Sequence, residues 1–250
     1  ARVLCGDATV LATELLSGSG SAVFCDPARR TARGRSWRTA DLQPPWSFVR
    51  GLLDGARPAC VKVGPGLPYA DLPPDVAAEW VSHRGNVVEL ALWRLPGRAP
   101  ARAATLLPAG VTREVEEPAP VLAVAAPGAY VFEPDGAAIR AGLVPGLGAE
   151  LGLRRLDLHV AYLTGDAPRV TPWLTSFRVV EALPVNDKAL RAWVRQRGIG
   201  VLEIKKRGLD IDPAQLRRRL RPSGAHAATL MLTPTVDGAR ALVVERMPAP

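Results

Sequence analysis

The sequence predicts an α/β protein made of two successive parts, and three observations carry this prediction. Near the start, short apolar runs that end at Gly or Asp alternate with longer helix-compatible stretches, a pattern typical of a parallel sheet with helical crossovers. A stretch rich in Glu and Pro at 114–120 interrupts this pattern. From 176 onward, the pattern is strand, helix, strand, helix and a closing pair of strands.

The first part, which we expect to span 1–117, should hold a sheet. Apolar runs predict three of its strands, at 2–7, 21–26 and 59–64. Residues 9–18 have helical spacing that stops at Gly18. Two further apolar runs lie close together in the sequence and should form an antiparallel pair that closes the sheet, at 86–95 and 103–110.

We expect a connecting segment with a helix at 118–172. Within it, residues 129–153 predict a strand, a turn at 134–136 and a helix that Pro145 and Gly146 interrupt. A further strand is expected at 158–166.

A smaller α/β domain is expected at 173–250. Asp187 is the predicted N-cap of its first helix, and Asp212, followed by Pro213, is that of its second. The expected strands are 176–184, 200–208, 227–233 and 239–246, and the expected helices are 188–197 and 213–220.

Composition bounds the function only loosely. A formal net charge of +8 over 250 residues favours phosphate-rich partners such as RNA, although an Arg- and Ala-rich composition of genomic origin explains the charge equally well. The three cysteines lie in apolar stretches and should be reduced core thiols of a cytoplasmic protein. Neither a metal site nor a membrane span is expected, because no Cys/His ligand spacing and no apolar run of membrane length occurs.

The segment Asp26-Pro27 deserves a functional hypothesis because of where it falls. Ligands of open parallel sheets bind beyond the carboxyl ends of the strands, and Asp26 ends the predicted strand 21–26. Pro27 restricts its predecessor to extended geometry, so the Asp26 carboxylate should be a fixed acceptor for a hydrogen-bond donor. The alternative is that Asp26 merely ends the strand and caps the next element.

These residues resemble a known family, the Rossmann-type S-adenosylmethionine-dependent methyltransferases. "VFCDPARR" resembles their fourth motif, which lies beside the transferable methyl group, and "LCGDA" resembles the preceding motif, whose acid meets the adenine. The order of these and of later segments, including "YVFEPDGAAIRAGL" and "LEIKKRGLDIDPAQLRRRL", is similar to bacterial members that carry a C-terminal THUMP-like domain.

The resemblance implies a fold and a cofactor. The fold would be the C-terminal part of a Rossmann-type methyltransferase sheet, followed by a smaller α/β THUMP-like domain. S-adenosylmethionine would contact Asp7, Ala8 and Asp26, and Asp26 and Pro27 would be the catalytic pair. The family's glycine-rich first motif and ribose-binding acid have no counterpart in the sequence. We therefore expect residues 1–250 to be part of a longer protein, and to be inactive and to bind the cofactor weakly alone.

The chain also lacks the catalytic nucleophile of one methyltransferase class that it resembles. RNA uracil-C5 methyltransferases share "DPAR" but carry a nucleophilic Cys after the fifth strand, where this chain has Val63. Cys60 lies earlier, inside the predicted strand. Covalent attack on a pyrimidine is thus disfavoured, and transfer to a nitrogen or oxygen needs no enzyme nucleophile.

Two basic clusters could contact RNA. Arg29, Arg30 and Trp37 follow Asp26 directly, and Lys62 lies near the next strand end; guanidinium groups bind phosphate and an indole can stack on a base. The second cluster is at the C-terminal end of the chain and contains Lys205, Lys206, Arg207, Arg217, Arg218 and Arg219. Solvated surface charge is the alternative explanation for both clusters.

Alternation along "LEIKKRG" puts Lys205 and Lys206 on opposite faces of a strand. One of them could therefore pair with an acid such as Glu203 or Asp210.

The function expected from the sequence is S-adenosylmethionine-dependent methyl transfer to RNA, tRNA or rRNA, near Asp26. A non-catalytic RNA-binding module and a small-molecule or protein methyltransferase are the alternatives. The sequence leaves the oligomeric state open.

Overall fold

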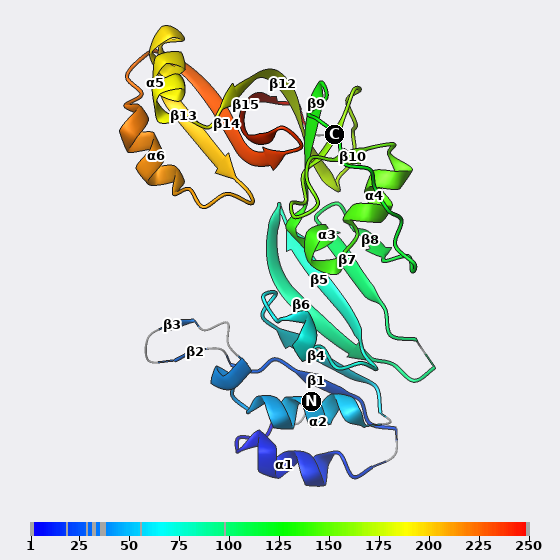
Figure 1. Ribbon diagram of the computed structural model, residues 1–250. Coiled ribbons are helices and arrows are strands. Elements are labelled where there is room, and N and C mark those ends of the chain that lie inside the picture. Colours follow the sequence, from blue (N-terminus) through cyan, green and yellow to red (C-terminus); the bar gives the residue numbers. More distant parts are fainter. Residues whose placement is uncertain are drawn as a thin grey trace. The chain divides into compact units, whose positions relative to one another are not determined.

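The chain divides into two compact units, each described here by itself. The computed structural model describes residues 3–18, 20–28, 30–31, 34–35, 39–55, 57–97 and 99–248 (Figure 1). One unit is 1–115 with 136–143, and the other is 116–135 with 144–250. Both contain a mixed sheet with helices. The expected segments 1–117, 118–172 and 173–250 follow other bounds and stay a prediction of domain organisation.

The first unit is built on a six-stranded sheet with the order β1-β4-β6-β5-β7-β8. Strands β1 and β4 are parallel, β6 is antiparallel to both β4 and β5, and β7 is parallel to β5. The carboxyl ends of β1 and β4 therefore lie at one edge of the sheet, beside the amino end of β6. The strands are β1 (Val23–Cys25), β4 (Ala59–Val63), β5 (Ala77–His83), β6 (Asn86–Arg94), β7 (Arg102–Leu107) and β8 (Val111–Glu114).

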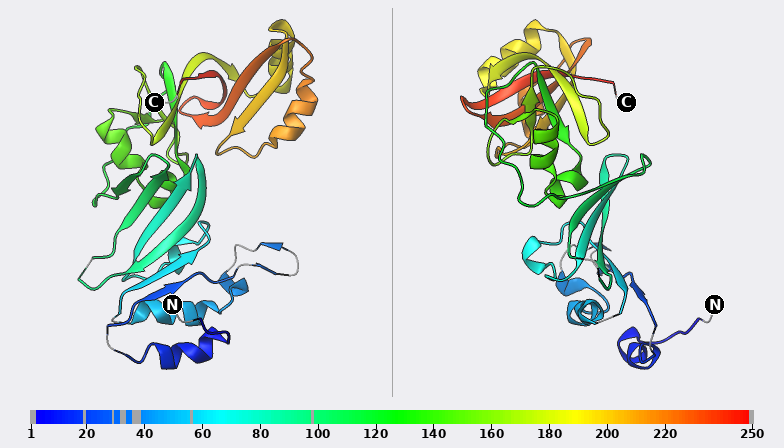
Figure 2. Two further views of the ribbon diagram at one scale, coloured as in Figure 1. Left: turned by 180° about the vertical axis from the view of Figure 1, so that it is seen from behind. Right: turned by 90° about the vertical axis from the view of Figure 1, so that its right-hand side faces the viewer.

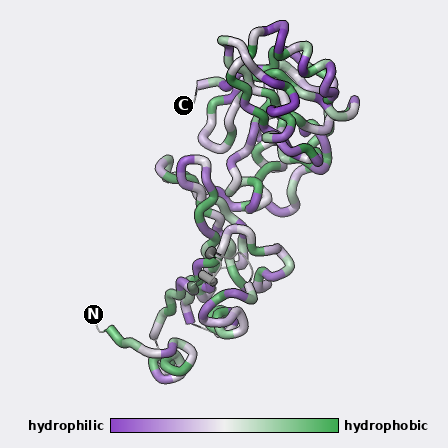
Figure 3. The backbone as a smooth tube through the Cα atoms, turned by 90° about the vertical axis from the view of Figure 1, so that its left-hand side faces the viewer, coloured by the Kyte–Doolittle hydropathy of each residue, from purple (hydrophilic) through white to green (hydrophobic). Residues whose placement is uncertain are grey.

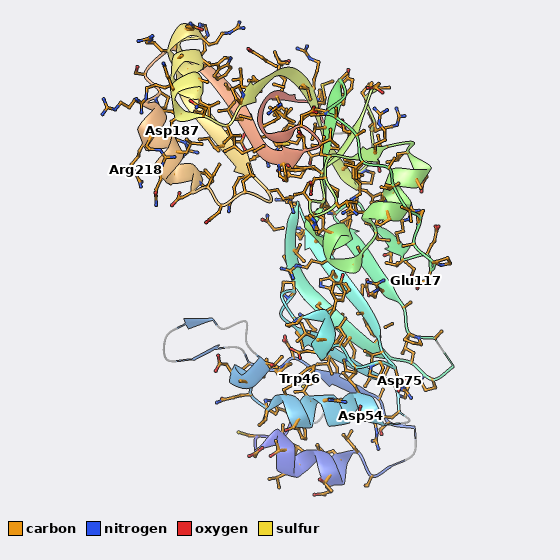
Figure 4. All side chains as sticks on the ribbon, in the orientation of Figure 1. Trp46, Asp54, Asp75, Glu117, Asp187 and Arg218 are labelled. Atoms are coloured by element: carbon orange, nitrogen blue, oxygen red, sulfur yellow. The ribbon has the colours of Figure 1, made fainter. Side chains whose placement is uncertain are left out.

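Helices pack on this sheet because they bury one apolar side. In α2 (Trp46–Asp54), whose end residues are labelled in Figure 4, Val49 and Leu53 are buried and the helix contacts β4. Helix α3 (Gly136–Ala141) contacts β5, β6 and β7. The remaining elements are α1 (Ala8–Leu15), the short turns η1 (Thr39–Asp41) and η2 (Tyr69–Asp71), and a small hairpin of β2 (Arg30–Thr31) and β3 (Gly34–Arg35).

Two predictions for this unit are wrong. Residues 3–7 form no strand, and Asp7 instead begins α1. The runs 86–95 and 103–110 do not pair with each other, because the unpredicted strand β5 lies between β6 and β7. Strand β5 joins β6 through a two-residue turn, Arg84-Gly85, with φ of 51° and 78°. Positive φ at both positions is the geometry of a tight hairpin turn.

Several apolar side chains near the N-terminus are exposed in this structure. The tube in Figure 3 is hydrophobic over the first described residues, yet Val3 and Leu4 are 90% and 43% exposed. Helix α1 has no buried residue, and Phe24 on β1 is 67% exposed. The apolar core of this unit lies instead around β4, β5 and β6, where Val61, Trp80 and Leu90 are almost fully buried.

The second unit is a seven-stranded mixed sheet in the order β10-β11-β9-β12-β15-β14-β13. Its last six elements follow the predicted order of strand, helix, strand, helix and two strands, so that prediction is confirmed (Figure 2). The elements are β9 (Tyr130–Pro134), α4 (Val144–Glu150), β10 (Arg154–Arg155), β11 (Leu163–Gly165), β12 (Leu174–Pro184), α5 (Asp187–Gln196), β13 (Ile199–Lys206), α6 (Pro213–Leu220), β14 (His226–Thr235) and β15 (Gly238–Arg246).

Two apolar clusters hold this unit together. One joins α5 and α6 to the sheet through Leu190, Leu216 and Leu230. The other contains Tyr162, Phe177 and further buried side chains. Successive residues of β14 and β15 alternate between the clusters, as Leu230 and Met231 do, so the two clusters lie on opposite faces of the sheet.

Two local predictions for this unit need correction. The helical stretch is interrupted at Gly142, whose φ is +90°, and not at Pro145 and Gly146, which lie inside α4. The N-cap of α5 is Asn186, whose Oδ1 accepts hydrogen bonds from the backbone N–H of Lys188 and Ala189, while Asp187 is the first helical residue. The predicted cap of α6 by Asp212, with Pro213 at the first position, is confirmed.

Candidate functional site

Asp26 is held at the carboxyl end of β1. Pro27 behind it is buried, and Ala28 exchanges two backbone hydrogen bonds with Gln43, N–O distances of 2.7 and 3.1 Å. This antiparallel bridge joins residues 28 and 43 close to Asp26 in the chain. The Asp26 side chain is 53% exposed. It is therefore an accessible carboxylate between strand β1 and the backbone bridge at Ala28.

Lys62 and Glu89 face Asp26 across the strand ends. Cys25 pairs with Val61, so the next residues along the two parallel strands, Asp26 and Lys62, are neighbours. The Lys62 Nζ lies 3.8 Å from Asp26 Oδ2 and 2.9 Å from Glu89 Oε2. The shorter distance is a hydrogen bond and the longer one is not. The ammonium is thus bonded to Glu89 while it lies near Asp26.

Sequence reasoning named Asp26 and Lys62 but missed Glu89. A signal existed, because Lys62 pairs with Ala91 and Val63 with Leu90 in the antiparallel partner β6. A carboxylate placed two residues before Ala91 shares its face of the sheet. Finding it required knowing that β6 pairs with β4, and the expected pairing of this strand was a different one.

Asp7 has a local structural role. Its carboxylate accepts hydrogen bonds from the backbone N–H of Thr9, at 2.8 Å, and from Thr9 Oγ1, at 2.7 Å. These bonds hold the pKa of Asp7 below its usual value and cap α1, whose first residue is Ala8. The carboxylate is fully exposed and retains capacity for a further donor. A contact of Asp7 or Ala8 with a cofactor stays a prediction.

The predicted RNA contacts after Asp26 are described only in part. Arg29 and Trp37 lie outside the described residues. The backbone of Arg30 belongs to β2, which pairs with β3.

The cysteines differ from one another in environment. All three are free thiols. Cys60 is buried, and burial raises its pKa to about 11, with the carboxylates of Glu89 and Glu79 adding to the rise. Cys25 is half-buried, while Cys5 is exposed, so the expectation of a core thiol is wrong for Cys5. Val63, which stands where related enzymes carry a nucleophile, is buried.

Some of the C-terminal basic side chains bond to an acid within the unit, and others face solvent. Lys205 Nζ lies 2.7 Å from Glu133 Oε2, and Arg207 Nη2 lies 3.6 Å from Glu133 Oε1. Lys206 is exposed and donates to the Leu209 carbonyl at 3.3 Å. The prediction that the two lysines lie on opposite faces with one paired to an acid is confirmed. The acid, however, is Glu133 from β9 and not Glu203 or Asp210.

The Glu133 contacts extend into an aromatic cluster. The Arg207 guanidinium lies 5.2 Å from the centre of the Tyr162 ring, and Lys205 Nζ lies 5.7 Å from that of Phe177. Burial raises the pKa of Tyr162 to about 12, with Glu133 adding to the rise and Arg207 opposing it. Lys205 and Arg207 therefore pack inside the unit, and their role in RNA binding stays a prediction.

Helix α6 offers a more accessible basic surface. Arg218, labelled in Figure 4, is exposed on this helix. Its neighbours bond within the unit, since Arg219 Nε lies 2.6 Å from Asp187 Oδ2 and Arg217 Nε donates to the Leu202 carbonyl.

The described residues hold neither a metal-binding group nor a helix that could span a membrane. These residues contain no group of three or more His, Cys, Asp or Glu side chains that could hold a metal ion. None of the helices in the described part of the chain has the length and apolar character that a membrane crossing requires.

Comparison with known proteins gives matches to both parts of the chain. Residues 174–246 match the family model described as THUMP domain-like. Two proteins of Mycobacterium tuberculosis, from strains CDC 1551 / Oshkosh and H37Rv, are each 38% identical to the chain over 218 residues, or 84% of this chain. Each is named an uncharacterized S-adenosylmethionine-dependent methyltransferase. The chain spans 59% of the length of these relatives.

A solved structure supports the fold over nearly the whole chain. It is the crystal structure of a protein from Porphyromonas gingivalis W83, described as a candidate methyltransferase. The TM-score is 0.71 at 24% identity, and the match covers 90% of this chain and 59% of that one. These comparisons confirm the predicted fold class and the expected resemblance: the chain is similar to S-adenosylmethionine-dependent methyltransferases, and its C-terminal part to a THUMP domain.

Proposed function

We propose that the protein to which this chain belongs is a cytoplasmic S-adenosylmethionine-dependent methyltransferase that acts on RNA, with Asp26 orienting the acceptor atom. The observation that carries the proposal is the exposed Asp26 carboxylate on a fixed backbone at the carboxyl end of a parallel strand, where ligands of such sheets bind. The names of the two relatives support the reaction class.

The residues of this chain fit part of a cofactor site. Asp7 is an exposed acceptor at the start of α1, and Asp26 is an accessible acceptor at the strand end; hydrogen-bond donors such as an adenine amine suit both. When bound, the cofactor supplies a methyl group already activated on a sulfonium. The task left to the chain is positioning. Asp26 would accept a hydrogen bond from an N–H or O–H of the acceptor, aligning its lone pair with the methyl group.

RNA as the substrate rests on charge and on the C-terminal match. The formal net charge is +8, and counterion release makes such a chain favour phosphate-rich partners. The match to a THUMP domain-like model covers the same part of the chain as Arg218 and Lys206, two exposed basic residues. Arg29, Arg30, Trp37 and Lys62 would add contacts near the reacting atom.

The proposal is tested by mass spectrometry of RNA nucleosides from cells with and without the gene. The expected result is one methylated nucleoside that disappears from tRNA or rRNA in the deletion and returns with the wild-type gene. Unchanged RNA together with a lost methyl group on a small molecule or protein would replace RNA by that substrate. If methylation of RNA, small molecules and proteins were all unchanged, the remaining interpretation would be a non-catalytic RNA-binding module.

A further inference from the structure

Lys62 lies between two carboxylates, and its distances to them are unequal. Its Nζ is 2.9 Å from Glu89 Oε2 and 3.8 Å from Asp26 Oδ2. Lys62 and Glu89 are each about 30% exposed at the side chain, while Asp26 is 53% exposed. The more sheltered carboxylate therefore binds the ammonium, and the more accessible one does not.

This arrangement bears on the charge of the site. Asp26 and Glu89 place two carboxylates beside the Lys62 ammonium at these strand ends. The oxygens of the Asp26 carboxylate favour a neutral N–H or O–H donor, or a cation, over an anion.

We propose that Glu89 is a positioning residue of the methyl-transfer site: it retains the Lys62 ammonium so that the Asp26 carboxylate stays open to the acceptor. This inference rests on the proposed function, in which Asp26 accepts a hydrogen bond from the acceptor. Without the Glu89 carboxylate, the Asp26 carboxylate, 3.8 Å away, would be open to the Lys62 ammonium as a replacement partner. The ammonium would then bond to the oxygens that the acceptor needs.

The test uses the full-length protein, tritiated methyl donor and RNA from cells that lack the gene. Glu89→Gln should lower kcat/KM about tenfold, because Lys62 would then occupy Asp26 oxygens and the acceptor would lose one charge-assisted hydrogen bond. Glu89→Asp, which keeps a carboxylate, should retain most of the activity. Glu114→Gln is the matched control: it makes the same charge change on β8, the edge strand farthest from β1, and should leave kcat/KM unchanged.

A double variant separates positioning from a general structural role. If Glu89 acts by restraining Lys62, then Glu89→Gln in a Lys62→Met background should change kcat/KM less than about twofold relative to Lys62→Met alone. An equal loss in both backgrounds, or no loss in Glu89→Gln, would overturn the proposal.

A crystal structure of Glu89→Gln gives a readout that does not depend on activity. The Lys62 Nζ should move from 3.8 Å to hydrogen-bond distance of an Asp26 oxygen. If it stays away from Asp26, the positioning role is wrong whatever the activity. If it moves but the wild-type protein transfers no methyl group to RNA, the restraint of Lys62 stands and the proposed substrate fails.

Discussion

At the residue scale, the state of the Cys60 thiol bears on whether the proposed methyl transfer could use a covalent enzyme intermediate. It lies in β4, two residues before Lys62, and is 8% exposed. Burial, followed by the carboxylates of Glu89 and Glu79, raises its pKa to about 11. The thiolate is the nucleophilic form of cysteine, and at neutral pH this thiol is protonated. Cys60 is therefore a poor nucleophile, which disfavours a covalent enzyme intermediate in the proposed reaction.

Cys60→Ala should leave methyl transfer by the full-length protein within about threefold of wild type, because no step uses the thiol. It should lower the melting temperature slightly, since it removes a buried atom. Thiol labelling of the folded wild-type protein should modify the exposed Cys5 before Cys60. Loss of activity in a folded Cys60→Ala variant, or Cys60 reacting first, would restore the covalent mechanism.

The basic residues of the second unit should also behave differently from one another. Lys206→Gln and Arg218→Gln, which change exposed side chains, should weaken tRNA binding and reduce the log–log salt slope by about 0.7 to 0.9 for each lost phosphate contact. Lys205→Gln should chiefly lower stability, because it removes the ammonium that bonds to Glu133. Fluorescence titration at two salt concentrations and thermal melting measure these effects.

The opposite pattern would contradict this assignment. If Lys206→Gln with Arg218→Gln left affinity and salt slope unchanged, the RNA role of this surface would be dropped. If Lys205→Gln weakened RNA binding without loss of stability, Lys205 would be a direct RNA contact.

At the element scale, the break between α3 and α4 shows how a helix end is specified. Gly142, at φ +90°, follows the last residue of α3. Its N–H bonds to the carbonyls of Ala138 and Ile139, and the N–H of Leu143 bonds to that of Ala138 at 2.9 Å. This is a glycine-terminated helix end with the carbonyls satisfied. Pro145 lies in the first turn of α4, where proline costs no hydrogen bond.

Gly142→Ala should destabilise the protein by about 1 kcal/mol or more, because its backbone is left-handed and an added Cβ would meet the Arg102 guanidinium at 3.1 Å. Gly51→Ala is the matched control. Gly51 lies inside α2 with open space around it, so alanine should stabilise by about 0.5 to 1 kcal/mol. Denaturant unfolding of both variants would check the signs, and a stabilising Gly142→Ala would refute this helix end.

The elements that the sequence predicted well are those with local signals. Asp212-Pro213 marks the start of α6, and the turn at 236–237 marks the β14–β15 hairpin. The cap of α5 was missed by one residue because Asn186 and Asp187 are both good caps, and only the hydrogen bonds of Asn186 distinguish them. Strand β5 was missed because its turn, Arg84-Gly85, lacks the commonest hairpin residues.

At the scale of the whole molecule, pairing between distant strands could not be predicted. The runs 86–95 and 103–110 were expected to pair because they are neighbours in the sequence, yet β6 lies between β4 and β5. That placement brings Glu89 to Lys62 at the candidate site. Likewise, one of Lys205 and Lys206 was expected to pair with a nearby acid, but Lys205 bonds to Glu133, 72 residues away in the chain. Local sequence patterns thus identify candidate residues, but the partners of these residues depend on the pairing of strands that are distant in the sequence.

The central claim is that Asp26 acts on the acceptor in a methyl-transfer reaction. The most direct measurement compares wild type and Asp26→Ala of the full-length protein for methyl transfer to RNA from cells lacking the gene, and for S-adenosylmethionine affinity by calorimetry. We predict that Asp26→Ala abolishes transfer while cofactor affinity falls by less than about fivefold, because an acid that orients the acceptor matters chiefly in the transition state. Equal loss of transfer and of cofactor affinity would contradict the claim, as would a variant that retains transfer.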